Sequence, residues 1–471
     1  MDMPSDIQKR LQRFFNARHI AVVGASAKNG WFANVLANAA WIGADTRFYP
    51  VNPGADEVCG VKAYRSIAAL PEGVIDFAAI LVKEEQVLDV LRQLRERRIE
   101  NVLLFSSGYG ETGEAGREKQ RAVEDYCRRE GMLLMGPNCL GYMNFPTRVS
   151  MFLGRAVEGT LRVGHVAVVG QSGATTEVIV TKLLRRGLGI SLYATTGNEA
   201  VMTVEDCLEY LVHDPETKVI TGFFEGFRNI PKLEAVARAA ARRQVPILMI
   251  KVGRSAKAVQ AAKSHTGALA GNDAVLDGIL RQLGIIRVDT IEELAEAAHL
   301  FVHSPLPPGT GLGVCTLSGG LCGVYADLCA RYGIELPPLS DETLAGLRAV
   351  LPDFAQPDNP LDLTGGGFQQ GVDRVVELLL NDENLAVLAP LTVPPKGPED
   401  VFAEMINASF LSHIKTSPKP LVPIMFREAG DYARRYYEEH GIAAIEDPGL
   451  GFKAIAHLIQ YARFVREFQK R

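Results

Sequence analysis

The sequence predicts an α/β protein made of three doubly wound domains of the Rossmann or flavodoxin type, with mainly parallel sheets. Short apolar runs that end in a glycine- and serine-rich turn occur three times, at residues 20–26, 166–173 and 313–320, and a helical pattern follows each of them. A wholly apolar strand that leads into a helix is the first step of a parallel βαβ unit, because a strand buried on both faces needs no polar alternation. Further runs of this kind lie at 77–82 and 245–250.

Proline and glycine mark the expected domain boundaries. They interrupt the periodicity near residues 146–162 and 304–309. A chain of 471 residues is long enough for about three domains of the usual ~150 residues. We therefore expect domains at 1–150, 160–303 and 309–471.

The composition excludes several functional classes. The net charge is -5 and the basic residues are spread along the chain, so we expect no nucleic-acid partner and no binding to an anionic membrane. No apolar run reaches the ~18 residues of a membrane span, and the first residues lack the features of a signal peptide, so a cytoplasmic protein is expected. The seven cysteines are scattered without metal-ligand spacing, and no metal site is predicted.

The first glycine turn could hold a phosphate. Gly24-Ala25-Ser26 follows the first predicted strand and opens a helix, where backbone N–H groups and the helix dipole favour an anion. The turn is not GxGxxG, and the second strand ends in Asn52-Pro53 instead of an acidic residue, which disfavours a dehydrogenase. Residues 106–108 and 136–141 end later strands at the same predicted edge.

One histidine stands out among nine. His265 lies among small residues in segment 263–271, which we interpret as a loop after the alanine-rich run 253–262. A histidine that carries a phosphoryl group needs one nucleophilic ring nitrogen and an acceptor for the other, and Glu225, at the end of a predicted strand, is the candidate acceptor. The other histidines have no comparable surroundings, and we expect packing or surface roles for them: His19, His165, His213, His299, His303, His413, His440 and His457.

Six segments carry a resemblance to a known family. In their order along the chain they are 23–26, 49–53, 136–141, 171–174, 264–267 and 359–364. This order resembles that in the alpha-type portion of nucleoside-diphosphate-forming acyl-CoA synthetases, which are relatives of succinyl-CoA synthetase, and the resemblance covers nearly the whole chain. It implies a CoA site in the first domain and two ligase-type flavodoxin domains after it. The implied CoA site comprises Gly24, Ala25, Ser26, Asn52, Pro53, Ser106, Ser107 and Gly108.

The resemblance also implies roles for the second domain. His265 would carry the phosphoryl group, with Glu225 as its partner, and the helix start at Gln171, Ser172 and Gly173 would hold the phosphate. The possible acyl site is formed by Thr175, Thr176 and Asn198. Residues 175–177, Thr-Thr-Glu, stand where the family has a more apolar stretch, and this polarity favours a small hydroxylated or charged acid.

The implied reaction joins a carboxylic acid to CoA with ATP, through phosphohistidine and an acyl phosphate. The sequence has no segment resembling an ATP-grasp domain and no GxxxxGK[ST] loop, so we expect a separate ATP-grasp beta-type subunit that binds ATP and Mg²⁺. The alternative is a non-catalytic CoA- or nucleotide-binding regulatory protein of the same fold. Such a protein needs neither His265 nor Glu225, and the sequence has both. A protein acyltransferase would carry an additional acetyltransferase domain, for which we find no room.

Overall fold

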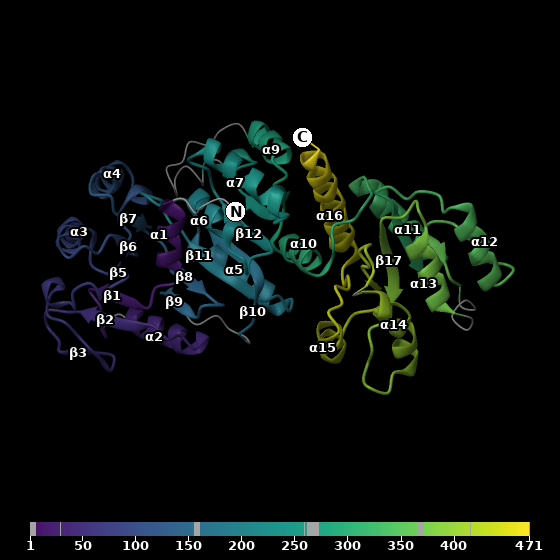
Figure 1. The fold of residues 1–471 in the computed structure, drawn as a ribbon, viewed down its shortest axis with the longest axis horizontal. Helices are drawn as coiled ribbons and strands as arrows, with labels where there is room; N and C mark the ends of the chain where they lie inside the picture. Colours follow the sequence, from purple (N-terminus) through teal and green to yellow (C-terminus); the bar gives the residue numbers. More distant parts are fainter. Residues whose placement is uncertain are drawn as a thin grey trace. The chain divides into compact units, whose positions relative to one another are not determined.

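The computed structural model describes residues 6–28, 30–154, 161–258, 260, 273–364, 371–414 and 416–470. The chain divides into two compact units, Met1–Ile291 and Glu292–Arg471. The first unit contains two large sheets and the second contains one (Figure 1).

The first sheet has five parallel strands in the order β2-β1-β5-β6-β7. Its strands are β1 (His19–Val23), β2 (Arg47–Val51), β5 (Phe77–Ile80), β6 (Asn101–Leu104) and β7 (Leu133–Met135). The helices of this part are α1 (Asp6–Phe15), α2 (Trp31–Ile42), α3 (Val87–Glu96) and α4 (Glu114–Arg129), and β3 (Glu57–Val58) pairs with β4 (Val61–Lys62) in a small hairpin. Every residue of β5 and β6 is buried, as the apolar runs predicted. The strand order reverses beside β1, so the turn after β1 lies at the switch point where open α/β sheets bind ligands.

The second sheet has seven strands in the order β14-β13-β12-β10-β11-β8-β9. Its strands are β8 (Gly141–Asn144), β9 (Val149–Phe152), β10 (Val163–Gly170), β11 (Ile190–Thr195), β12 (Val219–Phe224), β13 (Ile247–Lys251) and β14 (Ile286–Val288). Its helices are α5 (Gly173–Arg185), α6 (Val204–His213), α7 (Ile230–Arg243) and α9 (Asp273–Gln282). Helix α5 packs on one face of the sheet, while α6 and α7 pack together on the other, as right-handed crossovers require (Figure 1).

Two strands extend the second sheet from an earlier part of the chain than the predicted boundary. Strands β8 and β9 form an antiparallel hairpin, and β8 pairs antiparallel with β11. Residues 141–152, placed mostly in the first domain by the expected boundary at 150, therefore belong to the second sheet. The hairpin covers the edge of β11, whose residues are all buried and whose backbone groups need partners.

Helix α1 connects the two sheets of the first unit. Phe14 stacks on Phe77 of the first sheet with ring centroids 5.0 Å apart, and its carbonyl accepts the Tyr142 hydroxyl of β8 at 2.6 Å. Phe15 packs against Tyr210 of α6, also at 5.0 Å. One continuous apolar core contains residues of both sheets, and this shared core makes residues 1–291 a single unit.

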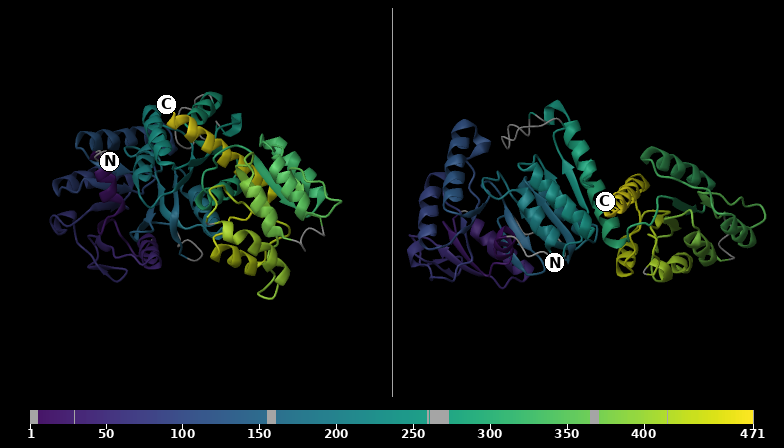
Figure 2. Two further views of the ribbon diagram at one scale, coloured as in Figure 1. Left: turned by 45° about the vertical axis from the view of Figure 1, so that its right-hand side comes forward. Right: turned by 45° about the horizontal axis from the view of Figure 1, so that its top comes forward.

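The second unit contains a sheet of four parallel strands in the order β16-β15-β17-β18. Its strands are β15 (Leu312–Thr316), β16 (Leu361–Asp362), β17 (Val387–Thr392) and β18 (Ile424–Met425). Its helices are α10 (Ile291–His303), α11 (Gly319–Tyr332), α12 (Asp341–Val350), α13 (Val372–Asn381), α14 (Val401–Ile414), α15 (Asp431–Glu439) and α16 (Pro448–Gln469). The long yellow helix α16 packs beside α11 (Figure 2). There Tyr325 of α11 stacks on Phe452 of α16 with ring centroids 5.2 Å apart.

The predicted fold class is confirmed, because three mainly parallel sheets are connected by helices. None of the helices in the described ranges is both long enough and apolar enough to cross a membrane.

Candidate active site

The carboxyl edge of the first sheet brings together the turns predicted to bind CoA. Gly24 follows β1 with a φ of 86°, and a Cβ there would lie 2.8 Å from Val82 Cγ1. Asn52, after β2, donates Nδ2 to the carbonyl of Ala25 at 2.8 Å. Ser106, after β6, donates its hydroxyl to the carbonyl of Val82. The remaining predicted residues of this edge are at least partly exposed: Ser26, Pro53, Ser107 and Gly108.

The helices that follow the three similar strands begin without a capping side chain. Helix α2 has Gly30 at its N-cap, α5 has Ser172 and α11 has Ser318, and none of the three has an acidic residue in its first turn. By contrast, Asn229 caps α7 and Ser340 caps α12 through side-chain hydrogen bonds. The first N–H groups of an uncapped helix are suited to bind an anion.

At the start of α5, the hydroxyl groups hydrogen-bond within the turn. Ser172 Oγ donates to Thr175 Oγ1 at 3.0 Å, which leaves the helix N–H groups without a serine cap. Thr176 is wholly buried, and its hydroxyl donates to the Ser172 carbonyl at 2.6 Å. Thr176 therefore stabilises the helix start, while the half-buried Thr175 lies closer to the surface.

Gln171 ties the ends of two neighbouring strands together. Its Oε1 accepts the backbone N–H groups of Glu225 at 2.6 Å and Gly226 at 3.1 Å. Its Nε2 donates to Glu199 Oε2 and to the Gly226 carbonyl, both at 2.9 Å. These four bonds use the full capacity of the amide, so the Gln171 side chain, predicted to bind phosphate, instead holds the turn after β12 beside the start of α5.

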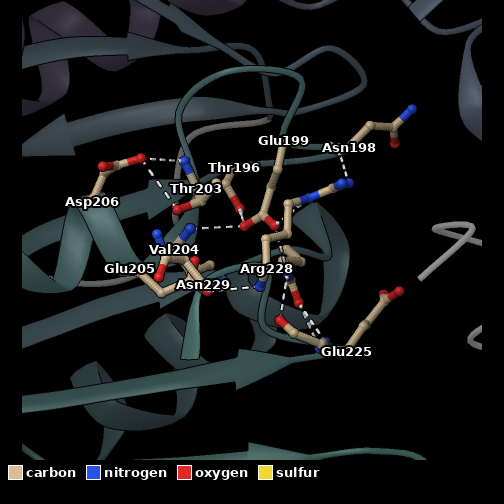
Figure 3. A network of polar contacts seen from close by, with 12 residues as sticks. Thr196, Asn198, Glu199, Thr203, Val204, Glu205, Asp206, Glu225, Arg228 and Asn229 are labelled. Atoms are coloured by element: carbon tan, nitrogen blue, oxygen red, sulfur yellow. Dashed lines mark hydrogen bonds and ion pairs between the residues drawn. The ribbon is translucent and has the colours of Figure 1, made fainter. Parts of the chain in front are cut away.

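Glu225 directly follows β12 and is 8% exposed. In Figure 3 its carboxylate points away from Glu199 and Arg228. Its backbone N–H donates to Gln171 Oε1. The structure thus places Glu225 and Ser172, predicted to act on the same phosphoryl group, on either side of Gln171. His265, the predicted phosphoryl carrier, lies outside the described residues.

Lys251 lies on the strand next to Glu225. It ends β13, whose register pairs Lys251 with Phe224, the residue before Glu225. Burial lowers the Lys251 pKa, and the neighbouring Arg287 guanidinium lowers it further, while the carboxylates of Asp273 and Glu225 oppose this. A half-buried ammonium group therefore lies in the electrostatic environment of Glu225.

Glu199 is the centre of a buried polar network, shown in Figure 3. It is 3% exposed, and its Oε1 accepts the Thr196 hydroxyl at 3.0 Å and the Val204 N–H at 2.8 Å. Its Oε2 accepts Gln171 Nε2 and, at 3.3 Å, Arg228 Nε. Burial raises the pKa of Glu199 to about 7, and the nearby Glu205 carboxylate adds to this, while the hydrogen bonds and the arginine charge oppose it.

Glu205 and Arg228 complete the network. Glu205, in the first turn of α6, is wholly buried and accepts the backbone N–H groups of Arg228 at 2.7 Å and Asn229 at 2.8 Å. Arg228 Nη2 donates to the Asn198 carbonyl at 2.7 Å. The turn that contains Glu225 is therefore held by α6 as well as by Gln171.

Asn198 links this network to the first sheet. Its Nδ2 donates to Glu111 Oε2 at 2.5 Å and to Gln120 Oε1 at 3.2 Å, and its Oδ1 accepts Asn138 Nδ2 at 3.2 Å. Glu111 Oε1 in turn accepts the N–H of Gly108 at 2.7 Å, in the turn predicted to bind CoA. The side chain of Asn198, predicted at the acyl site, thus connects the carboxyl edge of the second sheet to that of the first sheet.

Sequence reasoning missed Glu199, Arg228, Glu111 and Lys251. A signal was present for Glu199 and Lys251, because both follow or end apolar strands at the carboxyl edge of one parallel sheet. Nothing in the sequence pairs Glu111 with Asn198. In the part of the chain that the structure describes, no group of three or more His, Cys, Asp or Glu residues is arranged to hold a metal ion.

Comparison with known domains places the chain in the class of CoA-ligase-like α/β proteins. Residues 18–144 match the family model described as a CoA binding domain, and residues 163–301 match the one described as a succinyl-CoA ligase like flavodoxin domain. The first model covers the strands whose carboxyl edge carries Gly24, and the second covers the network around Glu199.

Relatives that match nearly the whole of this chain define the family. The alpha subunit of ADP-forming acetate–CoA ligase II from Pyrococcus furiosus is 32% identical over 97% of this chain and 98% of the subunit. A trans-feruloyl-CoA synthase from an unknown prokaryotic organism is 34% identical over 97% of this chain, which spans 65% of that protein. The dinucleotide-forming acetyl-coenzyme A synthetase 1 of Candidatus Korarchaeum cryptofilum, solved with phosphate and ADP, has a TM-score of 0.85 and 29% identity over 98% of both chains. The chain belongs to the family of ADP-forming acyl-CoA ligases, as an alpha-type chain.

Proposed function

We propose that this chain is the alpha-type subunit of an acid–CoA ligase that makes acyl-CoA from a carboxylic acid, CoA and ATP, with formation of ADP. The observation that carries the proposal is the pairing of Glu225 with an uncapped helix start through Gln171. A carboxylate that can orient an imidazole and a helix start that can bind an anion are the two groups that a phosphohistidine needs. Family membership supports the same reaction.

The proposed reaction proceeds through His265. A phosphoryl group on His265 passes to the substrate carboxylate, and the thiol of CoA then attacks the acyl phosphate and releases phosphate. Glu225 accepts the ring N–H of His265, which fixes the tautomer and leaves the other nitrogen as the nucleophile. The first N–H groups of α5, at Ser172 and Gly173, face the phosphate oxygens, with Gln171 as a positioning residue.

CoA binds, in this proposal, at the carboxyl edge of the first sheet. Because Gly24 has no side chain, the turn after β1 can lie close to Val82, which a Cβ would meet. The uncapped start of α2 supplies N–H groups for a phosphate. The proposed contacts are Gly24, Ala25, Ser26, Asn52, Pro53, Ser106, Ser107 and Gly108. Of the predicted domains, 1–150 without the β8–β9 hairpin would serve as the CoA-binding domain, 160–303 up to the end of the first unit as the domain with the phosphohistidine, and 309–471 as a second ligase-type domain.

The proposed partner is an ATP-grasp beta-type subunit, which binds ATP and Mg²⁺. The name of the Pyrococcus relative as a subunit alpha and the ADP bound to the Korarchaeum relative support a nucleotide-dependent complex. For the substrate we propose a small hydroxylated or charged acid near Thr175, at the start of α5. Thr176 and Asn198 would support the residues of this site without contacting the acid, since their polar groups bond within the protein.

The test is phosphorylation with labelled ATP after co-expression with an ATP-grasp subunit. The wild-type chain should take up acid-labile label and His265→Ala should take up none, while His413→Ala, on α14, should be labelled like wild type. Equal label on wild type and His265→Ala would overturn the mechanism. A panel in which only unsubstituted fatty acids react would overturn the proposed acid.

A further inference from the structure

We propose that Glu199 is a positioning residue for phosphoryl transfer: it holds the Gln171 amide in the orientation that fixes Glu225. The inference rests on the proposed function, because it assigns Glu199 a part in the chemistry of Glu225. Glu199 accepts a hydrogen bond from Gln171, and Gln171 in turn accepts the backbone N–H of Glu225.

A glutamine amide can adopt two orientations, which exchange its oxygen and its NH₂ group. In the observed orientation, Gln171 Oε1 faces the two N–H donors of Glu225 and Gly226, and Nε2 faces two acceptors, Glu199 Oε2 and the Gly226 carbonyl. A flipped amide would put NH₂ against two donors and oxygen against two acceptors. Because a buried donor or acceptor without a partner is costly, the Glu199 carboxylate helps to select the observed orientation.

Glu199 is itself fixed from three elements. The Thr196 hydroxyl lies after β11, the Val204 N–H lies at the start of α6, and Arg228 Nε comes from the turn after β12. The backbone of Glu199 has a φ of 57°, a left-handed conformation that residues other than glycine seldom adopt. The backbone of Glu199 is therefore strained, and four donors hold its buried carboxylate in one orientation.

The consequence for chemistry follows from where Gln171 lies. Gln171 directly precedes Ser172, the N-cap of α5, and its side chain holds the backbone of Glu225. One amide therefore sets the position of Glu225 relative to the helix start that would bind the phosphate. A displacement of about 1 Å between reacting groups can lower a rate on the order of a hundredfold.

The experiment uses the complex of this chain with its ATP-grasp subunit. The rate of His265 phosphorylation is measured in a single turnover with labelled ATP, beside the KM for CoA and the urea midpoint of unfolding. The variants are Glu199→Gln, Gln171→Met and the double variant, with Glu199→Asp as a second change that keeps the charge but draws the carboxylate back. Glu293→Gln is the matched control, since Glu293 is another buried carboxylate, bonded to Lys453 and His457 in the second unit.

Each single variant should slow phosphorylation about tenfold or more with the KM for CoA changed less than about twofold. The double variant should be no slower than the slower single variant, because both remove the same support. Glu293→Gln should phosphorylate at the wild-type rate even if its unfolding midpoint falls. Rates within about twofold of wild type for folded Glu199→Gln or Glu199→Asp, or multiplicative losses in the double variant, would overturn the inference. Failure of the wild-type chain to be labelled on His265 would instead overturn the proposed function.

Discussion

The raised pKa of Glu199 predicts a measurable dependence of stability on pH. Burial raises this pKa from the ordinary 4.5 to about 7, and the Glu205 carboxylate adds to the effect, against the opposing Gln171 and Arg228. The folded chain therefore binds a proton at Glu199 that the unfolded chain has already lost between these two values. Linkage then requires the free energy of unfolding to fall as the pH rises through this window.

The size of the effect follows from the two pKa values. At about 1.36 kcal/mol per pH unit, a window from 4.5 to about 7 corresponds to roughly 3 kcal/mol, most of it lost between pH 5 and 8. Glu199→Gln cannot ionise and lacks this loss. Between pH 5 and pH 8, the free energy of unfolding of the wild type should therefore fall by about 2–3 kcal/mol more than that of Glu199→Gln.

Tryptophan fluorescence during urea unfolding is a suitable assay. The chain has two tryptophans, Trp31 and Trp41, and both lie in the first unit with Glu199, so the signal reports on that unit. The control is Glu293→Gln in the second unit, which should leave the pH dependence of this signal unchanged. If Glu199→Gln and wild type lose the same free energy between pH 5 and 8, Glu199 does not carry the raised pKa and the reasoning fails.

Three further perturbations test the two edges. Gly24→Ala adds a Cβ 2.8 Å from the Val82 side chain at a φ of 86°, and it should cost roughly 1–3 kcal/mol of stability and weaken CoA binding measured by calorimetry. The control is Gly60→Ala, which has a φ of 80° but open space around it and should leave CoA binding unchanged. Glu111→Ala removes the acceptor of the Gly108 N–H and should weaken CoA binding about tenfold in the same measurement. An unchanged affinity would show that the turn at Gly108 does not depend on its hydrogen bond to Glu111. Glu225→Gln should slow His265 phosphorylation by about a hundredfold or more in the labelled-ATP assay, and a rate close to wild type would remove Glu225 from the mechanism.

Much of the fold could be predicted because parallel strands buried on both faces leave a continuous apolar signal. The runs that begin at residues 20, 166 and 313 form β1, β10 and β15, each followed by a helix. The attachment of β8 and β9 was not predictable in the same way. Strand β8 pairs with β11, some fifty positions later, and β9 pairs with β8; this pairing depends on a free sheet edge that a sequence does not display.

The site divides along a similar line. Gly24, Ser172 and Glu225 could be proposed from the sequence because each follows an apolar strand, and ligands bind at the carboxyl ends of the parallel strands of a sheet: Gly24 lies at this edge of the first sheet, Ser172 and Glu225 at that of the second. Gln171 was proposed as a phosphate ligand because of its place beside a helix start. Its side chain instead holds the turn that contains Glu225, and only the four hydrogen-bond partners seen in the structure reveal this role.

The sequence by itself therefore determined the α/β class, the three strand–turn–helix openings and the order of motifs that marks an acyl-CoA ligase, since these depend on local pattern. The tertiary structure alone decided that Glu199 and Glu205 are buried together, that Gln171 supports Glu225, and that Asn198 meets Glu111 from the first sheet. The physical reason is that hydrogen bonds and buried charges depend on distance and direction between residues far apart in the chain. Hydrophobic periodicity records which face is buried, but not which polar groups meet there.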